Sequence, residues 1–353
     1  MSEPASTTTV DARLGALYAI GGGPGANRVG YTQAEDEAHE LAAGWLREAG
    51  LEVEVDRHGN LIGRLRGSES DLPEVWSGSH LDSVPQGGRF DGALGVVGAL
   101  QAVSRVGRSR RTLAVVAFRD EERGCAGSRG FVAGAARLPG AFVELHHEQG
   151  PRLALLGAPL AVVTSIVGYV RAERVVEGRA GHAGTTPMDA RDDALVHAAA
   201  EILRIRDVAA SIPDAVATVG RIEAEPGGTN VIPGRVRFTV DARAPDAERL
   251  AQLLDGLGLS RDGVVEPTTF GGAPVRALRA AIAARGLPLV ELPSGAGHDA
   301  GVLARAGVPS AMLFVRAGND GVSHSPDETA APEDVALAID VLADALERLA
   351  SAP

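Results

Sequence analysis

The sequence predicts an α/β protein with a largely parallel sheet. Apolar runs that favour strands alternate with stretches of helical periodicity over the first half of the chain. From residue 168 the order changes to strand, helix, strand, strand, helix, strand, which is typical of a ferredoxin-like α+β unit. The 353 residues suffice for about two domains. We therefore predict a first domain, residues 1–167 and 273–353, interrupted by an inserted domain, residues 168–272.

The first domain should begin with two helices, at residues 11–20 and 32–49, because apolar residues recur there at helical spacing. Residues 21–25 between them are rich in glycine but follow a helix, so we interpret them as a turn and not as a phosphate loop. Further helices are expected at residues 93–106 and 332–350. Strands of this domain are predicted at LEVEVDR, NLIGRLR, PEVWSGS, RTLAVVAF, AFVEL, LAVVTSIV and AMLFV.

The inserted domain should contain two helices, at residues 189–206 and 247–257. Its four predicted strands are YVRAERVVEG, VATVGRIEA, RVRFTVDAR and GVVEPTTF. The chain shows no internal repeat and no low-complexity segment.

The charge balance argues against nucleic-acid or membrane-surface partners. The net charge is −12, the isoelectric point is near 5.3, and no long basic stretch occurs. All 34 basic residues are arginine. The absence of lysine from the sequence excludes both Schiff-base chemistry and a P-loop lysine.

A single cysteine, Cys125, cannot form an internal disulfide, which is typical of a reducing compartment. The stretch MSEPASTTTVDAR has neither the basic nor the apolar region of a secretory leader, and no segment reaches about 18 unbroken apolar residues. We therefore expect a cytoplasmic protein. Close to the acidic stretch 120–122, Cys125 has no neighbours that would activate a thiol, so we expect it to be buried.

Polar residues gather where one predicted strand ends. In WSGSHLDSVPQGGRFDGALG, His80, Asp82 and Asp91 follow an extended run within a glycine-rich loop. Histidine and carboxylate ligands suit zinc or a similar divalent ion, and Asp82 could fix the tautomer of His80. Asp91 lies next to a glycine, so its carboxylate has room to bridge two ions.

Later strands deliver more candidate ligands at their carboxyl ends. RTLAVVAF is followed by Arg-Asp-Glu-Glu, AFVEL by His-His-Glu-Gln, and AMLFV leads to a loop containing SHSPDE. Open α/β sheets place their active sites at this edge. A serine hydrolase is disfavoured because no GxSxG motif occurs; Ser128 follows Ala126 where that motif needs glycine.

The order of the motifs carries a family resemblance. GSHLDSVPQGGRFDG, DEE, ELHHEQGP, GHAGTTPM, NVIPG, SGAGHDA and GVSHSPDE occur in this order between Gly44 and Glu328. The chain resembles the amidase/hydantoinase/carbamoylase family, dinuclear zinc amidohydrolases related to carboxypeptidase G and aminoacylase. The resemblance implies a zinc-peptidase-like catalytic domain with a mixed sheet flanked by helices, and an inserted lid and dimerisation domain.

The resemblance also implies two ion sites that share one carboxylate. The first would be formed by His80, Asp91 and His146, and the second by Asp91, Glu122 and His324. Zinc is the expected metal, while manganese, cobalt and nickel accept the same ligands. Two divalent ions against two carboxylates leave a net positive site suited to an anionic substrate.

Further roles follow from the resemblance alone. Glu121 would be the general base, Asp82 would support catalysis through His80, and His182 would stabilise the oxyanion, with a dimer partner as one route. The resemblance also implies a homodimer formed through the inserted domain. The residues expected to bind a small carboxylate substrate are Gln149, His182, Asn230, Arg243, Gly295 and Gly297.

For several residues a structural role remains open beside a role in the site. Arg243 could be an ordinary surface arginine, and His147 could compete with His146 as a ligand or could simply pack or reach solvent. His298 and Asp299 are assigned to support of the glycine turn in SGAGHDA. Surface or turn positions are expected for His39, His58 and His197.

The leading functional hypothesis is hydrolysis of N-carbamoyl-L-amino acids. Allantoate and N-carbamoyl-β-alanine are close alternatives, and an N-acyl hydrolase, an aminopeptidase or a noncatalytic binding protein lie further off. Only 24 positions separate Glu122 from His146, fewer than is usual in the family, which puts substrate preference in question. Glu121 argues against the binding protein, since binding alone needs no base beside the metal.

Overall fold

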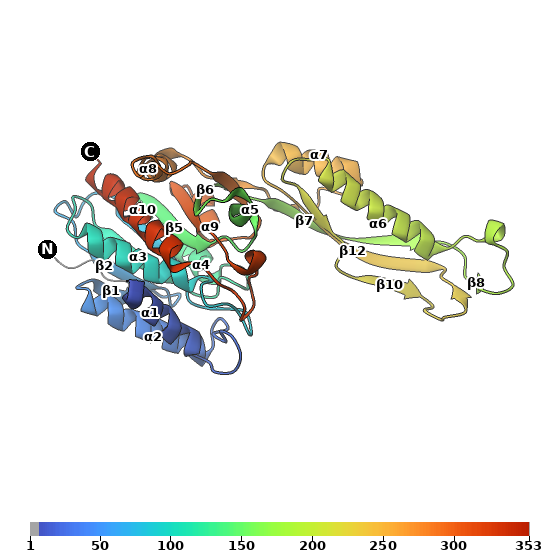
Figure 1. The fold of residues 1–353 in the computed structure, drawn as a ribbon, viewed down its shortest axis with the longest axis horizontal. Coiled ribbons are helices and arrows are strands. Elements are labelled where there is room, and N and C mark those ends of the chain that lie inside the picture. Colours follow the sequence, from blue (N-terminus) through green and yellow to red (C-terminus); the bar gives the residue numbers. More distant parts are fainter. Residues whose placement is uncertain (1–6, 353) are drawn as a thin grey trace. The chain divides into compact units, whose positions relative to one another are not determined.

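The computed structural model describes residues 7–352 and divides the chain into two compact units (Figure 1). Unit 1 comprises residues 1–164 and 269–353, and unit 2 comprises residues 165–268. Residues 1–6, part of the stretch without leader features, lie outside the described residues. No helix among the described residues is both long enough and apolar enough to cross a membrane.

Unit 1 contains a nine-stranded mixed sheet, which confirms the predicted α/β class. Its strand order is β1-β2-β4-β3-β5-β15-β6-β13, and β14 pairs with β6. The central strands β4, β3, β5 and β15 are mutually parallel, whereas β2 and β6 on either side run antiparallel to their neighbours. The strands are β1 (Glu52–Val55), β2 (Leu61–Leu65), β3 (Val75–His80), β4 (Leu113–Phe118), β5 (Ala141–His147), β6 (Leu160–Ile166), β13 (Thr268–Thr269), β14 (Glu291–Ser294) and β15 (Ser310–Val315).

Helices cover this sheet and make the central strands its core. Every residue of β3, β4, β5 and β15 is buried, as expected for parallel strands covered on both faces. Helix α3 packs on β3, β4 and β5, α10 packs on α3 and α8, and α9 packs on β5, β15 and α4. The helices are α1 (Thr7–Ala19), α2 (Gln33–Glu48), α3 (Ala93–Val106), α4 (Ala126–Gly134), α5 (Arg152–Leu156), α8 (Gly272–Ala283), α9 (Asp299–Arg305) and α10 (Pro332–Ser351), with a 3-10 turn η2 (Asn319–Gly321).

The parallel strands bring their carboxyl ends to one edge of the sheet. His80 at the end of β3 lies opposite Phe118 at the end of β4, and His146 in β5 lies opposite Phe314 in β15. The segments that follow these strands therefore meet at this edge, where open α/β sheets bind their ligands.

Unit 2 is a small α+β unit with one sheet face covered by helices. β10 and β9 both pair with one side of β12, and β7 pairs with its other side. Helices α6 and α7 pack on this sheet around Ile205, Phe238 and Leu253, all nearly inaccessible to solvent. The elements are β7 (Gly168–Glu177), β8 (Gly181–His182), η1 (Met188–Ala190), α6 (Ala194–Ala210), β9 (Val216–Thr218), β10 (Ile222–Glu225), β11 (Val231–Ile232), β12 (Arg235–Ala244) and α7 (Ala247–Leu257).

Three predicted elements of unit 2 differ from the structure. The run VATVGRIEA is interrupted and forms β9 and β10 instead of one strand. The run GVVEPTTF forms no regular fourth strand: Val265 makes an isolated bridge to Tyr169, and β13 joins the large sheet. Pro267 between them lacks the N–H that a ladder needs. Helix α6 begins at Ala194 because Asp193 caps it, accepting from the N–H groups of residues 195 and 196.

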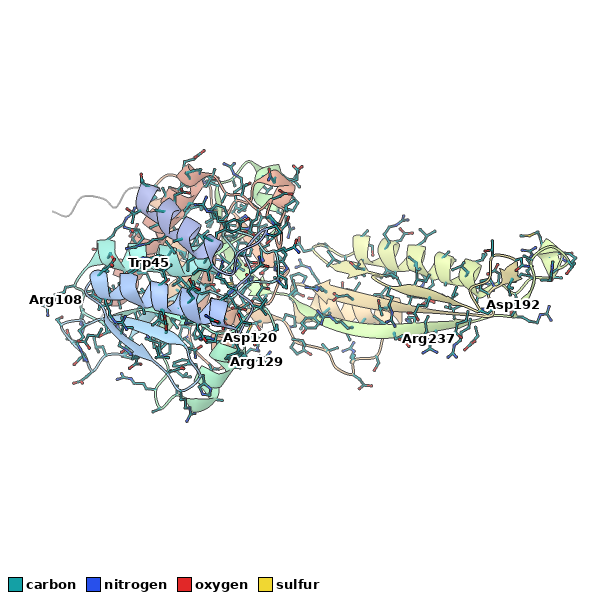
Figure 2. All side chains as sticks on the ribbon, turned by 90° about the horizontal axis from the view of Figure 1, so that it is seen from below. Trp45, Arg108, Asp120, Arg129, Asp192 and Arg237 are labelled. Carbon is teal, nitrogen blue, oxygen red and sulfur yellow. The ribbon has the colours of Figure 1, made fainter. Side chains whose placement is uncertain are left out.

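The outer surface of unit 2 is strongly charged. Figure 2 labels Asp192 and Arg237 on it, and Arg237 lies within 4 Å of both Glu173 and Glu225. Exposed pairs of this kind contribute little to stability, so the apolar layer between sheet and helices holds the unit together.

Candidate dinuclear metal site

The end of β3 and the loop after it place the first predicted ligands. His80 is the last residue of β3, and Asp91 lies two residues before the start of α3. Gly92 between Asp91 and α3 has φ 61°, and a Cβ there would lie 2.4 Å from the His80 ring. Only glycine tolerates both conditions, so the loop can bring Asp91 close to His80.

The first group of possible ligands is His80, Asp91 and His146. All three side chains are almost completely buried. The Asp91 Oδ1 atom lies 3.3 Å from Nε2 of His146 and 3.8 Å from Nε2 of His80. Two imidazoles and a carboxylate converging in this way suit a zinc-like divalent ion.

The second group is Asp91, Glu122 and His324, so the two groups share Asp91. Nε2 of His324 lies 3.2 Å from the second oxygen of Asp91, Oδ2, and 3.4 Å from Oε2 of Glu122. The side chain of His324 is 50% exposed, whereas those of the histidines in the first group are 1% exposed. His324 also has a left-handed backbone, φ 54°, a conformation that is concentrated at functional sites.

Neighbouring groups fix the ring orientation of both buried histidines. Nδ1 of His80 lies 3.2 Å from the carboxylate of Asp82, and Nδ1 of His146 lies 2.9 Å from the carbonyl oxygen of His147. The proton of each ring is therefore on Nδ1, which leaves Nε2 free to bind an ion. Asp82 also accepts from the backbone N–H groups of Glu121 and Glu122, at 3.0 and 3.1 Å.

The donor set fits a metal pair. Nε2 of His146 and Oε1 of Glu122 are buried without a hydrogen-bond partner among the described residues. Such orphaned atoms are costly in a folded protein unless they bind something. Two imidazole nitrogens and a carboxylate at one position, and a second carboxylate and an imidazole at the other, give both ions suitable ligands.

The charges of the second group are perturbed in the direction expected of closely spaced carboxylates. Burial, reinforced by the charge of Asp91, raises the pKa of Glu122 to about 7. The hydrogen bond to Asp91 raises the pKa of His324 to about 9. Burial opposes ionisation of Asp91, but the hydrogen bond from His324 and the buried histidines together hold the pKa of Asp91 well below its usual range.

Glu121 lies beside the ligands without belonging to either group. It is 9% exposed, and its Oε2 atom lies 3.8 Å from Nε2 of His80. Burial raises the pKa of Glu121 well above its usual range, against the lowering effect of His80, and the charges of Asp299 and Glu122 add to the rise. A carboxylate of raised basicity at the edge of a metal site is suited to general base catalysis.

A third buried group, Glu144, His146 and His298, was missed in the sequence. The carboxylate of Glu144 accepts from the Ser79 hydroxyl at 2.7 Å and from the Ala300 N–H at 2.8 Å. The ring of His298 lies 4.5 Å from that of His146, centroid to centroid, and its Nε2 atom is 2.8 Å from the Ser294 hydroxyl. A signal was available, because residues two apart in a strand share a face and Glu144 precedes His146 by two.

Two acids of this buried layer titrate near neutrality. Burial raises the pKa of Asp299 to about 7, and burial with the charge of Asp299 raises the pKa of Glu144 to about 7. His298 and Asp299, predicted to support the glycine turn in SGAGHDA, are both buried. The Ser294 hydroxyl that contacts Nε2 of His298 also bonds to the backbone of Ala296 in this turn, which agrees with that prediction for His298.

Three residues predicted to bind substrate belong to unit 1, as the ligand groups do: Gln149, Gly295 and Gly297. The amide nitrogen of Gln149 donates to Oδ2 of Asp91 at 3.0 Å and lies 3.5 Å from Nε2 of His324. A Cβ at Gly295 or Gly297 would meet no heavy atom within 4 Å. Gln149 therefore borders the ligand groups, and the two glycines border open space.

The remaining predicted residues, His182, Asn230 and Arg243, belong to unit 2. His182 is exposed in β8, and its pairing with Val231 places it next to Asn230. Its Nδ1 atom accepts from the Gly184 N–H at 3.0 Å, which leaves the proton on the outward Nε2 atom.

Arg243 does not join His182 and Asn230 within unit 2. It lies near one end of β12 and makes a two-point contact with Asp241, at 2.7 and 3.1 Å. At the other end of this strand Arg235 pairs with Glu177, the last residue of β7, and the chain continues from there to His182 in β8. Eight residues at about 3.3 Å each separate the two ends by about 26 Å. One small molecule cannot touch both positions of the same unit.

Three other expectations have clear outcomes. His147 neither reaches solvent nor lies in a ligand group: it is fully buried, and its Nε2 atom lies 3.1 Å from the Thr329 carbonyl oxygen. His39 was predicted at the surface, which is wrong, because it is 7% exposed and faces inward from α2. Cys125 is buried as expected, and burial raises the pKa of its thiol far above the usual range.

Known proteins match this chain over almost its whole length. Residues 76–348 match Peptidase family M20/M25/M40. The chain is 36% identical over 399 residues to the N-carbamoyl-L-amino acid amidohydrolase of Geobacillus stearothermophilus, covering 96% of this chain and 97% of the relative. It is 32% identical over 399 residues to the allantoate amidohydrolase of Bacillus subtilis (strain 168), covering 95% of each.

A solved structure shows the same architecture. The amidase of the hydantoinase/carbamoylase family from Burkholderia multivorans superposes with a TM-score of 0.92 at 32% identity, covering 99% of this chain and 98% of that one. The family match spans well over half of the chain, and the relatives match it nearly end to end. This chain therefore belongs to Peptidase family M20/M25/M40, alongside amidases of the hydantoinase/carbamoylase type.

Proposed function

We propose that this protein is a metal-dependent amidohydrolase that removes the carbamoyl group from N-carbamoyl-L-amino acids. The observation that carries the proposal is a pair of ligand groups that share Asp91, with the buried carboxylate Glu121 beside them. The similarity to N-carbamoyl-L-amino acid amidohydrolases supports the choice of substrate. The lone buried cysteine supports a cytoplasmic location.

Five side chains would hold two divalent ions, for which zinc is our first choice and manganese, cobalt or nickel the alternatives. When bound, the ions would polarise the scissile carbonyl and lower the pKa of water at the site. The residues that would hold them are His80, Asp91, Glu122, His146 and His324.

Glu121 would act as the proton carrier. In its ionised form it takes a proton from the water that attacks the ureido carbonyl, and it then delivers this proton to the leaving nitrogen. The C–N bond to the amino acid breaks, which releases the amino acid and carbamate, and carbamate decomposes to ammonia and carbon dioxide. Asp82 would hold both His80 and the backbone of residues 121 and 122 in place during this cycle.

The substrate carboxylate needs its own binding groups. Arg243 offers a planar guanidinium fork, which in the free protein is held by Asp241 and is therefore pre-oriented. Gln149 would add an amide donor, Asn230 would add another from a second chain because it lies next to His182, and the open backbone at Gly295 and Gly297 would leave room for the bound molecule.

We infer further that His182 serves the site of a second chain in a homodimer. Its outward Nε2–H could donate to the developing oxyanion, yet within unit 2 His182 lies beyond the end of β12 at Arg235, which is itself about 26 Å from Arg243. If His182 and Arg243 touch one substrate, they must come from different chains. Size-exclusion chromatography with light scattering tests this, and an active monomer would contradict it.

Allantoate hydrolysis is the second candidate, because the chain is also similar to the Bacillus subtilis allantoate amidohydrolase. Allantoate carries the same ureido groups and one carboxylate, so the same ligands would serve. N-carbamoyl-β-alanine differs from the leading substrate class only in the distance between its carboxylate and ureido groups.

Ammonia release separates these candidates. Protein stripped by a chelator and reloaded with zinc, manganese or cobalt would be assayed with N-carbamoyl-L-amino acids, allantoate, N-carbamoyl-β-alanine and N-acetyl amino acids. We expect metal-dependent ammonia release from N-carbamoyl-L-amino acids above all. Release from allantoate alone would select the second candidate. The proposal would be overturned if protein that binds two ions released no ammonia from any ureido compound.

A further inference from the structure

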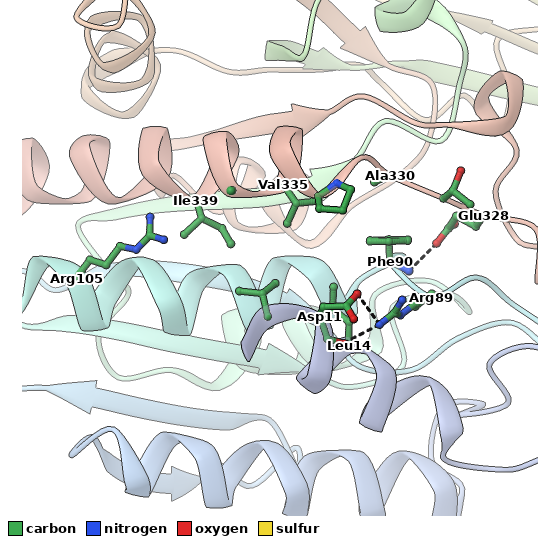
Figure 3. Close-up of a pocket in the computed structure, with 13 residues that line it drawn as sticks. Asp11, Leu14, Arg89, Phe90, Arg105, Glu328, Ala330, Val335 and Ile339 are labelled. Atoms are coloured by element: carbon green, nitrogen blue, oxygen red, sulfur yellow. Dashed lines mark hydrogen bonds and ion pairs between the residues drawn. The ribbon is translucent and has the colours of Figure 1, made fainter. Parts of the chain in front are cut away.

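The carboxylate of Glu328 connects two distant segments that carry predicted ligands. Its Oε1 atom accepts from the backbone N–H groups of Phe90 and Asp91, at 2.7 and 3.0 Å, and its Oε2 atom accepts from the Ser323 hydroxyl at 2.8 Å. Figure 3 shows the contact between Glu328 and Phe90 at one end of a cavity between α1, α3 and α10. Glu328 thus touches the chain at the shared ligand Asp91 and one residue before the ligand His324.

The fit around Glu328 is close. Glu328 is 3% exposed, and a Cβ at Gly88 would lie 2.2 Å from its carboxyl carbon. The ring of His147 is stacked on that of Phe90, with centroids 6.1 Å apart, and its Nδ1 atom lies 3.8 Å from Oε2 of Glu328. A side chain confined on all these sides can fix the positions of the groups that it binds.

The second ligand group depends more than the first on neighbouring residues that hold its ligands in place. His324 is half exposed and lies in a loop with left-handed backbone geometry, so few contacts of its own side chain hold it. Glu122 of the same group lies four residues beyond β4, and Asp82 already fixes its backbone by accepting from its N–H at 3.1 Å. The anchor from Ser323 to Glu328 therefore carries much of the task of keeping His324 opposite Asp91.

We propose that Glu328 is a positioning residue that holds Asp91 and His324 at the spacing required by the second ion. The proposal rests on the metal site of the proposed function, but it concerns ion affinity and not the substrate. Among the described residues, Glu328 forms no hydrogen bond or ion pair with Glu122 or with any predicted substrate-binding residue, so its influence passes through the backbone of residue 91 and the loop of residue 323.

Ion binding measures this role directly. Calorimetric titration of chelator-stripped protein with Co²⁺, read together with the visible absorption of bound cobalt, gives the affinity of each of the two ions. In Glu328→Ala we expect the second ion to bind about 10- to 100-fold more weakly, the range typical when an outer partner of a metal ligand is lost. The first ion, held by His80 and His146, should lose much less.

Two further variants separate geometry from charge and from folding. Ser323→Ala removes only the hydroxyl contact and should weaken the second ion without affecting the first. Glu328→Gln keeps an oxygen for the two N–H groups and offers an amide to the Ser323 hydroxyl, so it should recover most of the lost affinity. Asp327→Asn is the matched control, because the exposed Asp327 carboxylate makes no hydrogen bond or ion pair with a described residue.

The outcomes distinguish this proposal from the proposed function. If the unaltered protein does not bind two ions, the metal site itself fails. If it binds two, equal affinities for the second ion in Glu328→Ala and in the unaltered protein overturn the positioning role. The same conclusion follows if Ser323→Ala binds the second ion normally, or if Glu328→Gln is as weak as the alanine variant.

Discussion

Unit 1 and unit 2 differ in the kind of side chain that they bury. In unit 2, where every residue is described, the buried polar side chains are Ser165 and Thr268, one at each end, and neither is charged. The described part of unit 1 buries many ionisable side chains. They include Arg28, Glu35, Asp82, Asp91, Arg119, Asp120, Glu121, Glu144, Asp299, Glu328 and Asp334.

This difference indicates that unit 1, and not unit 2, loses stability by burying the side chains of its candidate site. A buried charge is costly unless it is paired, hydrogen-bonded or bound to a metal. Unit 1 carries that cost around its candidate site, whereas unit 2 relies on an apolar layer between helices and sheet. Changes to the buried ionisable residues of unit 1 should therefore alter ion binding, turnover and pH dependence, and changes to the apolar layer of unit 2 should alter stability alone.

The largest effect is expected from Glu121→Gln. Loss of the general base should lower kcat by about 10²- to 10⁴-fold while both ions remain bound, because Glu121 belongs to neither ligand group. The neighbouring Glu122→Gln is the matched variant, and it should lose the second ion. Steady-state kinetics and metal analysis of both variants test the distinction; unchanged kcat in Glu121→Gln would remove Glu121 from the mechanism.

Leu253→Ala should produce the largest loss of stability in unit 2. Leu253 is fully buried between α7 and the sheet, so truncation leaves a cavity and should cost about 2–5 kcal/mol. Denaturant unfolding gives the free energy, and metal analysis should still find two ions per chain. A change in ion content would show that the two units are not independent in the way proposed.

His39 should make the stability of unit 1 depend on pH. Burial, with the charge of Arg119, lowers the pKa of His39 to about 3. Above pH 6.5 the ring is neutral whether the chain is folded or unfolded. Below pH 6.5 only the unfolded chain gains the proton, so this contribution falls by about 1.4 kcal/mol per pH unit until about pH 3.

The comparison of His39→Gln with the unaltered protein isolates this contribution from that of buried acids with raised pKa values, such as Glu144 and Asp299, whose effect on stability has the opposite pH dependence. Unfolding should be followed between pH 5 and 8. The difference in free energy between the two proteins should shrink as the pH falls, and His197→Gln, which changes an exposed histidine of unit 2, serves as the control. A constant difference would contradict the assignment.

The smallest effect is expected from Arg261→Gln in unit 2. Arg261 pairs with Asp255 at 3.2 Å, but both side chains are mostly exposed, so its loss should change the free energy of unfolding by no more than about 0.5 kcal/mol. Neither ion content nor kcat should change. A loss comparable to that of Leu253→Ala would mean that surface charge, and not the apolar layer, holds unit 2 together.

The sequence predicted those features that depend on one segment at a time. Parallel strands end at a common edge, so the positions of His80, Glu122 and His146 after apolar runs were enough to expect them near one another. Helix α3 has the predicted bounds because Ala93–Val106 is rich in small and apolar residues and is followed by Gly107, which caps its carboxyl end.

Features that depend on distant partners could not be read from the sequence. The role of Glu328 requires contacts across more than 200 residues, and the burial of His39 follows from packing against the strands beneath α2. The alternating pattern of GVVEPTTF favoured a strand, but the missing N–H of Pro267 and the path of the chain into the large sheet decided otherwise.

The two ligand groups differ in how far solvent reaches them, which should affect how firmly each ion is retained during purification. The histidines of the first group are shielded from solvent, whereas His324 is half exposed. An ion at the shielded position should leave slowly, and an ion at the open position should equilibrate with the medium within a purification. Preparations of one protein should then differ in the identity of a single ion per chain, and a mixed pair, zinc inside and cobalt outside, should be obtainable simply by dialysis.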